Sequence, residues 1–84
     1  MNEILLINAS GVEKPGVTRA ITRVLADANA RILDIGQAVI HDTLALGILV
    51  ELPIAAEIRA QLLEQIQQAT EPLGIQVRFQ AVTP

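Results

Sequence analysis

The residues best suited to ligand chemistry lie in the segment GVEKPGV, from Gly11 to Val17, between an apolar run and an amphipathic one. The first backbone N–H groups of a helix have no partner within it, and the helix dipole adds partial positive charge there. A helix that begins near Val17 would therefore favour a carboxylate at its start. Gly16 leaves room for such a ligand to approach. Glu13 or Asp34 could accept hydrogen bonds from an ammonium group on it.

The same segment also has a purely structural interpretation. Pro15 can preset φ in the first turn of a helix, and Gly16 can allow close packing of the helix on a sheet. Proline–glycine pairs are common signals of turns. Sequence chemistry alone therefore leaves two hypotheses open, a ligand site and a simple helix start.

A second group of reactive side chains, His41, Asp42 and Thr43, is consecutive in the sequence. Neighbouring residues at the tip of a hairpin alternate in direction and cannot converge on one substrate, so this trio predicts a turn. The sequence has no catalytic triad and no metal-ligating cluster. We expect no catalytic residues, no metal site and no cofactor.

Composition excludes several classes of function. The net charge is −3, from six basic and nine acidic residues, so the basic stripe expected of a nucleic-acid-binding protein is missing. RNA-recognition domains also need aromatic residues on their central strands, and Phe79 is the only aromatic residue here. The absence of cysteine excludes disulfides and thiolate metal sites, including those of metal chaperones. We expect no nucleic-acid partner.

The sequence has no signal of membrane insertion or secretion. The amino-terminal segment MNEILLINAS lacks a basic region and a long apolar stretch, and no run approaches about 20 apolar residues. We expect a soluble, cytoplasmic chain with no membrane contact.

The elements that would position the Gly11–Val17 segment follow from hydrophobic periodicity. Val17, Ala20, Ile21, Val24 and Leu25 have the spacing of an amphipathic helix. The whole pattern predicts strands over 4–9, 31–40, 43–52 and 75–82, and helices over 17–29 and 55–70. This βαββαβ order predicts one α+β domain over residues 1–84, a ferredoxin-like sandwich with two helices on one face of a four-stranded antiparallel sheet.

In that topology the strand over 31–40 lies at an edge of the sheet. It is apolar on both faces, with Ile32, Leu33 and Ile35 before Gly36 and further apolar residues after it. An exposed hydrophobic edge favours pairing with another chain, so we expect a homodimer, or a second copy of the fold, along this strand and the first helix. Asp34 is an acidic residue inside this strand, and it indicates an edge or interface position, or a ligand contact.

The segment GVEKPGVT, followed by ILDIGQAVIHDTLALGILVE and by QVRF at Gln76–Phe79, resembles the ACT domain family. The narrower resemblance is to the ACT domain at the amino terminus of bacterial phosphoserine phosphatases, and it covers about residues 3–82. The resemblance implies dimerisation, binding of a small ligand such as serine between two copies, and regulation of an enzyme of amino-acid metabolism. The ligand-binding residues that it implies, together with the helix-start argument, are Gly11, Val12, Glu13, Lys14, Pro15, Gly16, Val17, Arg31 and Asp34.

The chain departs from the family pattern at two of these positions. Amino-acid-binding members typically carry Asn or Asp where this chain has Glu13, and often Asn where it has Arg31. Arg31 could hold a ligand carboxylate or could pair with Glu13 across the interface.

The resembled phosphatase needs an aspartate nucleophile in a D-x-D motif, and no two aspartates here have that spacing. We therefore expect the chain itself to be catalytically inert. Two hypotheses follow, a regulatory domain that dimerises and binds an amino-acid-like ligand, and a structural dimerisation module without a ligand.

Overall fold

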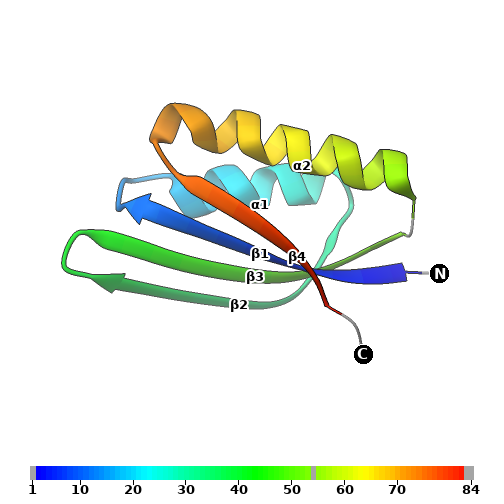
Figure 1. Ribbon diagram of the computed structural model, residues 1–84, viewed down its shortest axis with the longest axis horizontal. Helices are drawn as coiled ribbons and strands as arrows, with labels where there is room; N and C mark the ends of the chain where they lie inside the picture. The colour runs from blue at the N-terminus through cyan, green and yellow to red at the C-terminus, as the bar shows by residue number, and fades with distance from the viewer. Residues whose placement is uncertain (1, 54, 83–84) are drawn as a thin grey trace.

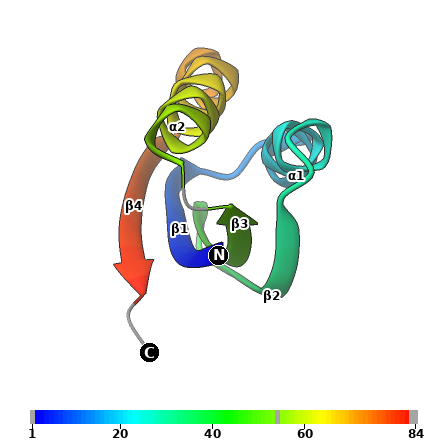
Figure 2. The ribbon, with the colours of Figure 1, turned by 90° about the vertical axis from the view of Figure 1, so that its right-hand side faces the viewer.

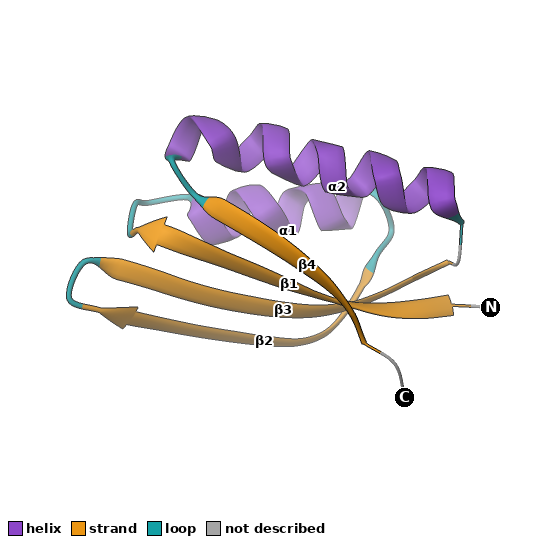
Figure 3. Ribbon diagram, in the orientation of Figure 1, coloured by secondary structure: helices purple, strands orange, loops and turns teal. Residues whose placement is uncertain are grey.

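A computed structural model describes residues 2–53 and 55–82 of the chain. Its elements in chain order are β1 (Asn2–Val12), α1 (Val17–Asp27), β2 (Arg31–Ile40), β3 (Thr43–Pro53), α2 (Ala56–Thr70), a short 3-10 helix η1 (Glu71–Leu73) and β4 (Gln76–Val82). The two helices lie next to each other on one face of a single sheet (Figures 1 and 3). The predicted ferredoxin-like βαββαβ sandwich is therefore confirmed.

The sheet has the strand order β2-β3-β1-β4, and every neighbouring pair is antiparallel. β1 and β3 pair along their whole lengths, from Asn2 opposite Pro53 to Val12 opposite Thr43. β2 and β4 are the edges, as right-handed crossovers require. The β1–α1 connection and the β2–β3 hairpin lie at the same end of the molecule (Figure 1).

The core lies between the helices and the sheet. Alternate residues of β1 and β3 point toward the helices, as in Leu5, Ile7 and Ile48, and they are at most 3% exposed. The predicted inner face of the first helix is present, with Ile21 and Leu25 fully buried. Because aliphatic side chains fill this layer, the single aromatic residue is only partly buried at its margin.

β2 has no residue that is buried or half-buried. Its large apolar side chains, from Ile32 to Ile40, are between 39% and 73% exposed. The pairing with β3 shifts register between Ile32 and Asp34, which leaves Leu33 as a bulge. The prediction of an apolar edge strand is confirmed, and Figure 2 shows β2 at the side of the sheet under α1.

Three details differ from the sequence-based prediction. α1 ends at Asp27, before the predicted end at Asn29, because Asn29 adopts a left-handed φ of 57° that a helix does not continue. The alternation of 75–82 predicts that Ala81 points inward, but Ala81 is exposed, since β4 curves away from α2 toward its carboxyl end (Figure 2). The helical spacing of Ile58, Leu62 and Ile66 predicts one inner stripe of α2, but Ile58 lies in the first turn and is 40% exposed.

Candidate ligand half-site at the start of α1

The loop from Gly11 to Gly16 is fastened on the side that faces β4. A Cβ atom on Gly11 would lie 2.9 Å from Ile75 Cδ1 and 3.0 Å from the Gly74 carbonyl oxygen, so the backbones approach closely here. The ammonium group of Lys14 donates a hydrogen bond of 2.9 Å to the Leu73 carbonyl oxygen at the end of η1. Gly11 and Lys14 therefore hold the loop in place within the single chain.

A third contact ties the loop to the β2–β3 hairpin. The backbone N–H of Glu13 donates to the carbonyl oxygen of Asp42 at 2.8 Å, and the exposed carboxylate of Glu13 lies at the surface. Val12 is 60% exposed, whereas Val17 is 1% exposed and belongs to the core. Only the backbone of Val17 is available to a ligand.

Gly16 precedes α1 with a φ of 89°, in the left-handed region. A Cβ atom there would meet nothing within 4 Å. The interpretation that Gly16 permits close packing of helix and sheet is therefore wrong. Glycine is favoured here because an L side chain at this φ is strained.

The first turn of α1 has no capping side chain and no acidic residue. Its first backbone hydrogen bond runs from Ala20 N–H to the Gly16 carbonyl oxygen. The N–H groups before Ala20 therefore have no hydrogen-bond acceptor within the helix. The hydroxyl of Thr18 donates to the amide oxygen of Gln37 at 3.0 Å, which links α1 to β2 beside these N–H groups. The loop, the helix start and β2 together form a polar corner.

Thr18 and Gln37 were missed in the sequence. Gln37 lies opposite Leu46 in the pairing of β2 with β3, and Leu46 is buried under the helices. Paired residues of antiparallel strands share a face, so Gln37 points to the helix side. The available signal was the position of Gln37, a polar residue between the apolar residues Ile35 and Val39 on one side of the strand.

Arg31 does not join this corner within one chain. It begins β2 at the end opposite the hairpin, about 30 Å from Ile40 for a strand rising ~3.3 Å per residue. Its guanidinium lies 3.9 Å from the carboxylate of Glu51, and its side chain is 77% exposed. The suggested pairing with Glu13 is thus not made within the chain.

Asp34 also lies apart from the loop. It is opposite Leu49 in the sheet, on the face away from the helices. Its carboxylate accepts a hydrogen bond of 2.9 Å from the N–H of Ile35. Of the acidic residues suggested for an ammonium group, only Glu13 is near the helix start.

The remaining sequence candidates have structural explanations. His41 and Asp42 form the β2–β3 turn, as predicted, and His41 has a left-handed φ of 58°. Residues 2–53 and 55–82 contain no group of three or more side chains arranged to hold a metal ion. No helix in the same part of the chain is long and apolar enough to cross a membrane.

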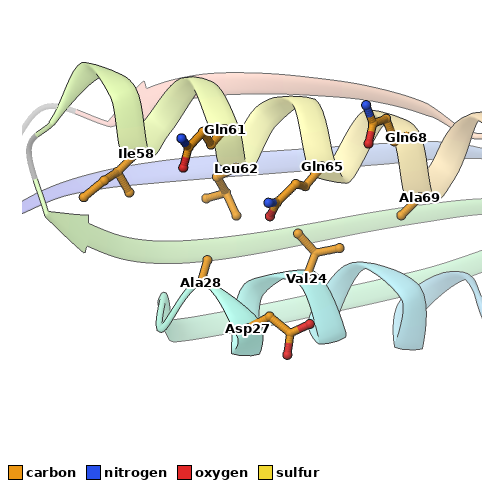
Figure 4. Close-up of a pocket in the computed structure, with 9 residues that line it drawn as sticks. All are labelled: Val24, Asp27, Ala28, Ile58, Gln61, Leu62, Gln65, Gln68 and Ala69. Atoms are coloured by element: carbon orange, nitrogen blue, oxygen red, sulfur yellow. The ribbon is translucent and has the colours of Figure 1, made fainter.

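A groove of about 660 Å³ runs between α1 and α2 on the outer side of the helices. Figure 4 shows Gln61 and Gln65 above it and Val24 and Leu62 lining it from the two helices. The glutamine-rich sequence of α2, with Gln61, Gln65, Gln67 and Gln68, predicts a solvated helix face. They are exposed, but Gln61, Gln65 and Gln68 also border this groove.

Comparison with known proteins decides the family. The family model of the ACT domain matches residues 3–80. The chain belongs to the ACT domain family. The resemblance carried by the loop and by the segment after it is therefore confirmed, and it extends over nearly the whole chain.

Similar ACT-like proteins occur in archaea and bacteria. A UPF0237 protein of Methanopyrus kandleri is 39% identical over 75 residues, which are 89% of this chain and 83% of that protein. Phosphoserine phosphatase SerB2 of Mycobacterium tuberculosis is 33% identical over 76 residues, 90% of this chain but 19% of that enzyme. The solved ACT domain protein of Streptococcus pneumoniae has the same fold, with a TM-score of 0.77, 18% identity, and coverage of 94% of this chain and 89% of that one.

These matches also bear on catalysis. The similarity to the phosphatase spans only a small part of that enzyme, whereas the similarity to the archaeal protein spans most of its length. The match to the phosphatase therefore extends to the ACT domain and gives no ground for assigning the enzyme's activity to this chain.

Proposed function

We propose that this chain is a cytoplasmic regulatory domain whose loop Gly11–Val17 and first turn of α1 form half of a binding site for an amino-acid-like ligand. The observation that carries the proposal is the uncapped start of α1 lying beside β2, an apolar edge strand that is exposed throughout. An uncapped helix start favours a carboxylate, and an exposed apolar edge favours a second chain.

The ligand carboxylate would accept hydrogen bonds from the first backbone N–H groups of α1. The Thr18 hydroxyl and the Gln37 amide, 3.0 Å apart, offer further polar contacts at the same corner. Gly16 keeps the approach open, since the space where its side chain would lie is empty. The carboxylate of Glu13 supplies an acceptor for the ammonium group.

A second copy would complete the site. If two β2 strands pair in antiparallel fashion about their centres, the start of one strand lies beside the end of the other. Arg31 of the partner subunit then begins its strand beside the hairpin end of β2, near the Gly11–Val17 loop, whereas Arg31 of the same chain lies about 30 Å away by strand length. Because its pairing with Glu51 directs Arg31 to the face away from the helices, its long side chain would reach the helix start around the end of its strand. Arg31 would hold the carboxylate or pair with Glu13 across the interface.

Regulation follows from this division of the site. A ligand that contacts both copies stabilises one relative arrangement of the two chains, and it couples ligand concentration to whatever is attached to them or bound by them. The match to SerB2 makes L-serine the first ligand to test, with serine biosynthesis as the setting. A structural dimerisation module without a ligand is the alternative, because the apolar edge of β2 alone would explain dimer formation.

Calorimetric titration with L-serine and a panel of other amino acids tests the proposal. We expect saturable heat for at least one of them and a melting temperature that rises with its concentration. Substitution of Gly16 is a poor test, because its positive φ strains any other residue. Thr18→Asp is sharper, because a carboxylate in the first turn suits the helix dipole but repels a ligand carboxylate.

Thr18→Asp should weaken binding at least about tenfold while the melting temperature without ligand stays equal or rises. Thr22→Asp adds the same charge one turn further along α1 and serves as the matched control. Absence of heat for every amino acid, with a stable dimer, would leave the structural module as the function.

A further inference from the structure

The sheet face opposite the helices has no helix or loop over it among the described residues (Figure 2). Alternation places Leu6, Asn8 and Ser10 of β1 on this open face, because Leu5, Ile7 and Ala9 are buried on the other. The corresponding residues of β3 are Ala45, Gly47, Leu49 and Glu51. In register they form cross-strand rows that extend onto β2 and β4.

The rows are asymmetric in side-chain size. In the central row, Arg78 of β4 and Asn8 of β1 are followed by Gly47 of β3 and Gly36 of β2. The next row repeats the order with Gln76, Ser10, Ala45 and Ala38. In these two rows the longer polar side chains, Arg78, Asn8 and Gln76, stand on the β4 half, and glycine and alanine lie on the β2 half.

Two hollows lie beside Gly47 on this face, one over β4, β1 and β3 and the other over β1, β3 and β2. One of about 290 Å³ is bounded by Asn8, Ser10, Ala45 and Arg78, and one of about 230 Å³ by Leu6, Asp34, Gly36 and Leu49. Both include Gly47, so they adjoin at the centre of the face.

Charge follows the same asymmetry. Arg78 stands at the β4 edge, and none of the ion pairs among the described residues includes it. Asp34 stands at the β2 edge. Its row lies next to the row of Arg78 and continues across the sheet through Leu49 and Leu6. Arg31 also lies on this face of β2, but it is paired with Glu51 at 3.9 Å. Among the described residues, the charged side chains of this face that make no ion pair are Arg78 on the β4 edge and Asp34 on the β2 edge.

We propose that a second copy of this chain packs on the open face, sheet against sheet, about a twofold axis parallel to the strands. Such an axis places β4 over the partner's β2 and β1 over the partner's β3. Asn8 then faces the partner's Gly47, and Arg78 faces the partner's Gly36 beside the partner's Asp34. In these two contacts a long side chain meets a glycine, and each contact occurs twice.

Leucine side chains lie beside the axis of this interface, in the row next to that of Asn8 and Gly47. Leu6 meets the partner's Leu49 next to the axis, and these four leucines are half-buried in the single chain. Glutamine and charged side chains surround them, which is the usual arrangement of a stable interface. Packed sheets in known sandwiches have strands within about 30° of each other, so the rows near the axis stay in register.

A twofold axis across the strands gives a poorer fit. It would stack Arg78 on the partner's Arg78 and Asn8 on the partner's Asn8, while glycine faced glycine. Like charges and paired large side chains would then oppose association. The face is complementary to itself only about the axis parallel to the strands.

The open-face pair is distinct from the β2-edge pair suggested for ligand binding. The twofold axis of the β2-edge pair is perpendicular to the sheet and lies beside β2. The twofold axis of the open-face pair is parallel to the strands and passes over the centre of the sheet, so the two axes do not intersect. Use of both contacts would build an open row of subunits rather than a closed oligomer, so the two pairs are alternatives. We assign the open-face pair to the ligand-free protein.

Sedimentation equilibrium of the ligand-free chain tests this assignment. We expect the mass to approach twice the 9.0 kDa of one chain as concentration rises. Gly47→Val should return the mass to that of one chain. The monomer tolerates this change, because a Cβ on Gly47 meets only Asn8 Oδ1 at 3.9 Å. A β-branched residue also suits a strand better than glycine, so the melting temperature should not fall.

Ala81→Val is the matched control, because it adds bulk to an exposed position on the other face of β4 and should leave the mass unchanged. Arg78→Asp and Asp34→Arg should each weaken the dimer at least tenfold, and the double variant should restore it. A Gly47→Val chain that remains dimeric would place the contact elsewhere and overturn the proposal. A wild-type chain that is monomeric at every concentration would also overturn it and leave this face to another partner.

Discussion

The two edge strands of this sheet occupy equivalent places in the fold but present different surfaces. β4 alternates in the manner of a half-covered strand, with Val77 and Phe79 partly buried against the core and polar residues between them. β2 is exposed at every position, and its helix-facing side still carries Ile35 and Val39. Within one chain α1 and α2 cover β4 and the central strands but leave the apolar residues of β2 uncovered. The difference indicates that β2, unlike β4, is a surface for another chain.

The largest effect expected from this comparison concerns two isoleucines on adjacent strands. Ile48 of β3 and Ile35 of β2 are directly opposite and share the helix-facing side, but Ile48 is fully buried and Ile35 is 46% exposed. Ile48→Ala should cost about 2–5 kcal/mol in the free energy of unfolding, because it leaves a cavity. Ile35→Ala should cost about 1 kcal/mol or less in the monomer.

Urea unfolding at low protein concentration measures both values. When a bound amino acid pairs the chains through β2, the cost of Ile35→Ala should increase, while that of Ile48→Ala should not. Equal costs for both substitutions in the monomer would mean that β2 is as well packed as β3, and the contrast between the edges would fail.

The next effect concerns how the loop Gly11–Gly16 is fixed toward β4. Gly11→Ala should destabilise the chain by about 1–3 kcal/mol, because the new Cβ would lie 2.9 Å from Ile75 Cδ1 and 3.0 Å from the Gly74 carbonyl oxygen. At a concentration where the chain is monomeric, Gly36→Ala is the control on β2, where a Cβ meets nothing within 4 Å, and it should stabilise by roughly 0.5 kcal/mol. Thermal unfolding gives the sign of each change. A neutral Gly11→Ala would show that the loop and the start of β4 are not held together.

The smallest effect concerns the second contact that holds the loop toward β4, the hydrogen bond of Lys14. Lys14→Met removes the hydrogen bond from the ammonium group to the Leu73 carbonyl oxygen but keeps the length of the side chain. Because this contact is exposed, the loss should be about 0.5–1 kcal/mol. Denaturant unfolding detects it, and Lys14→Arg, which keeps a donor, should recover part of the loss. A ligand-affinity change much larger than the stability change would instead give Lys14 a direct role in binding.

The fold could be predicted from the sequence because its signals are local and periodic. The spacing of Val17, Ile21 and Leu25 defines one helix face, and the absence of polar alternation in 31–40 marks an unusual edge. The site could be predicted only in part. Arg31 and Asp34 were grouped with the Gly11–Val17 loop, but the register sets one at the far end of β2 and the other on the opposite face.

Two further residues show why the rest of the site could not be predicted from the sequence. Thr18 and Gln37 meet only because α1 crosses over β2, and that contact depends on tertiary packing. The role of Gly16 likewise required its φ, since the same residue type serves close packing at Gly11 and a left-handed turn at Gly16.

The central claim is that the start of α1 in one chain and β2 of a second chain together form one ligand site. Mixing two defective chains tests it most directly. Thr18→Asp damages the helix start, and Arg31→Ala damages the residue contributed from β2. Each homodimer then has a defect in both of its sites, but a mixed dimer has one site with both parts intact.

Calorimetric titration of the mixture, with the amino acid that binds the wild-type chain, is the deciding measurement. Neither variant should bind alone, and an equal mixture should regain binding at wild-type affinity with about one quarter of the wild-type stoichiometry, since random pairing makes half of the dimers mixed. A mixture that binds no better than its components, while mass measurements show that mixed dimers form, would contradict a site shared between two chains.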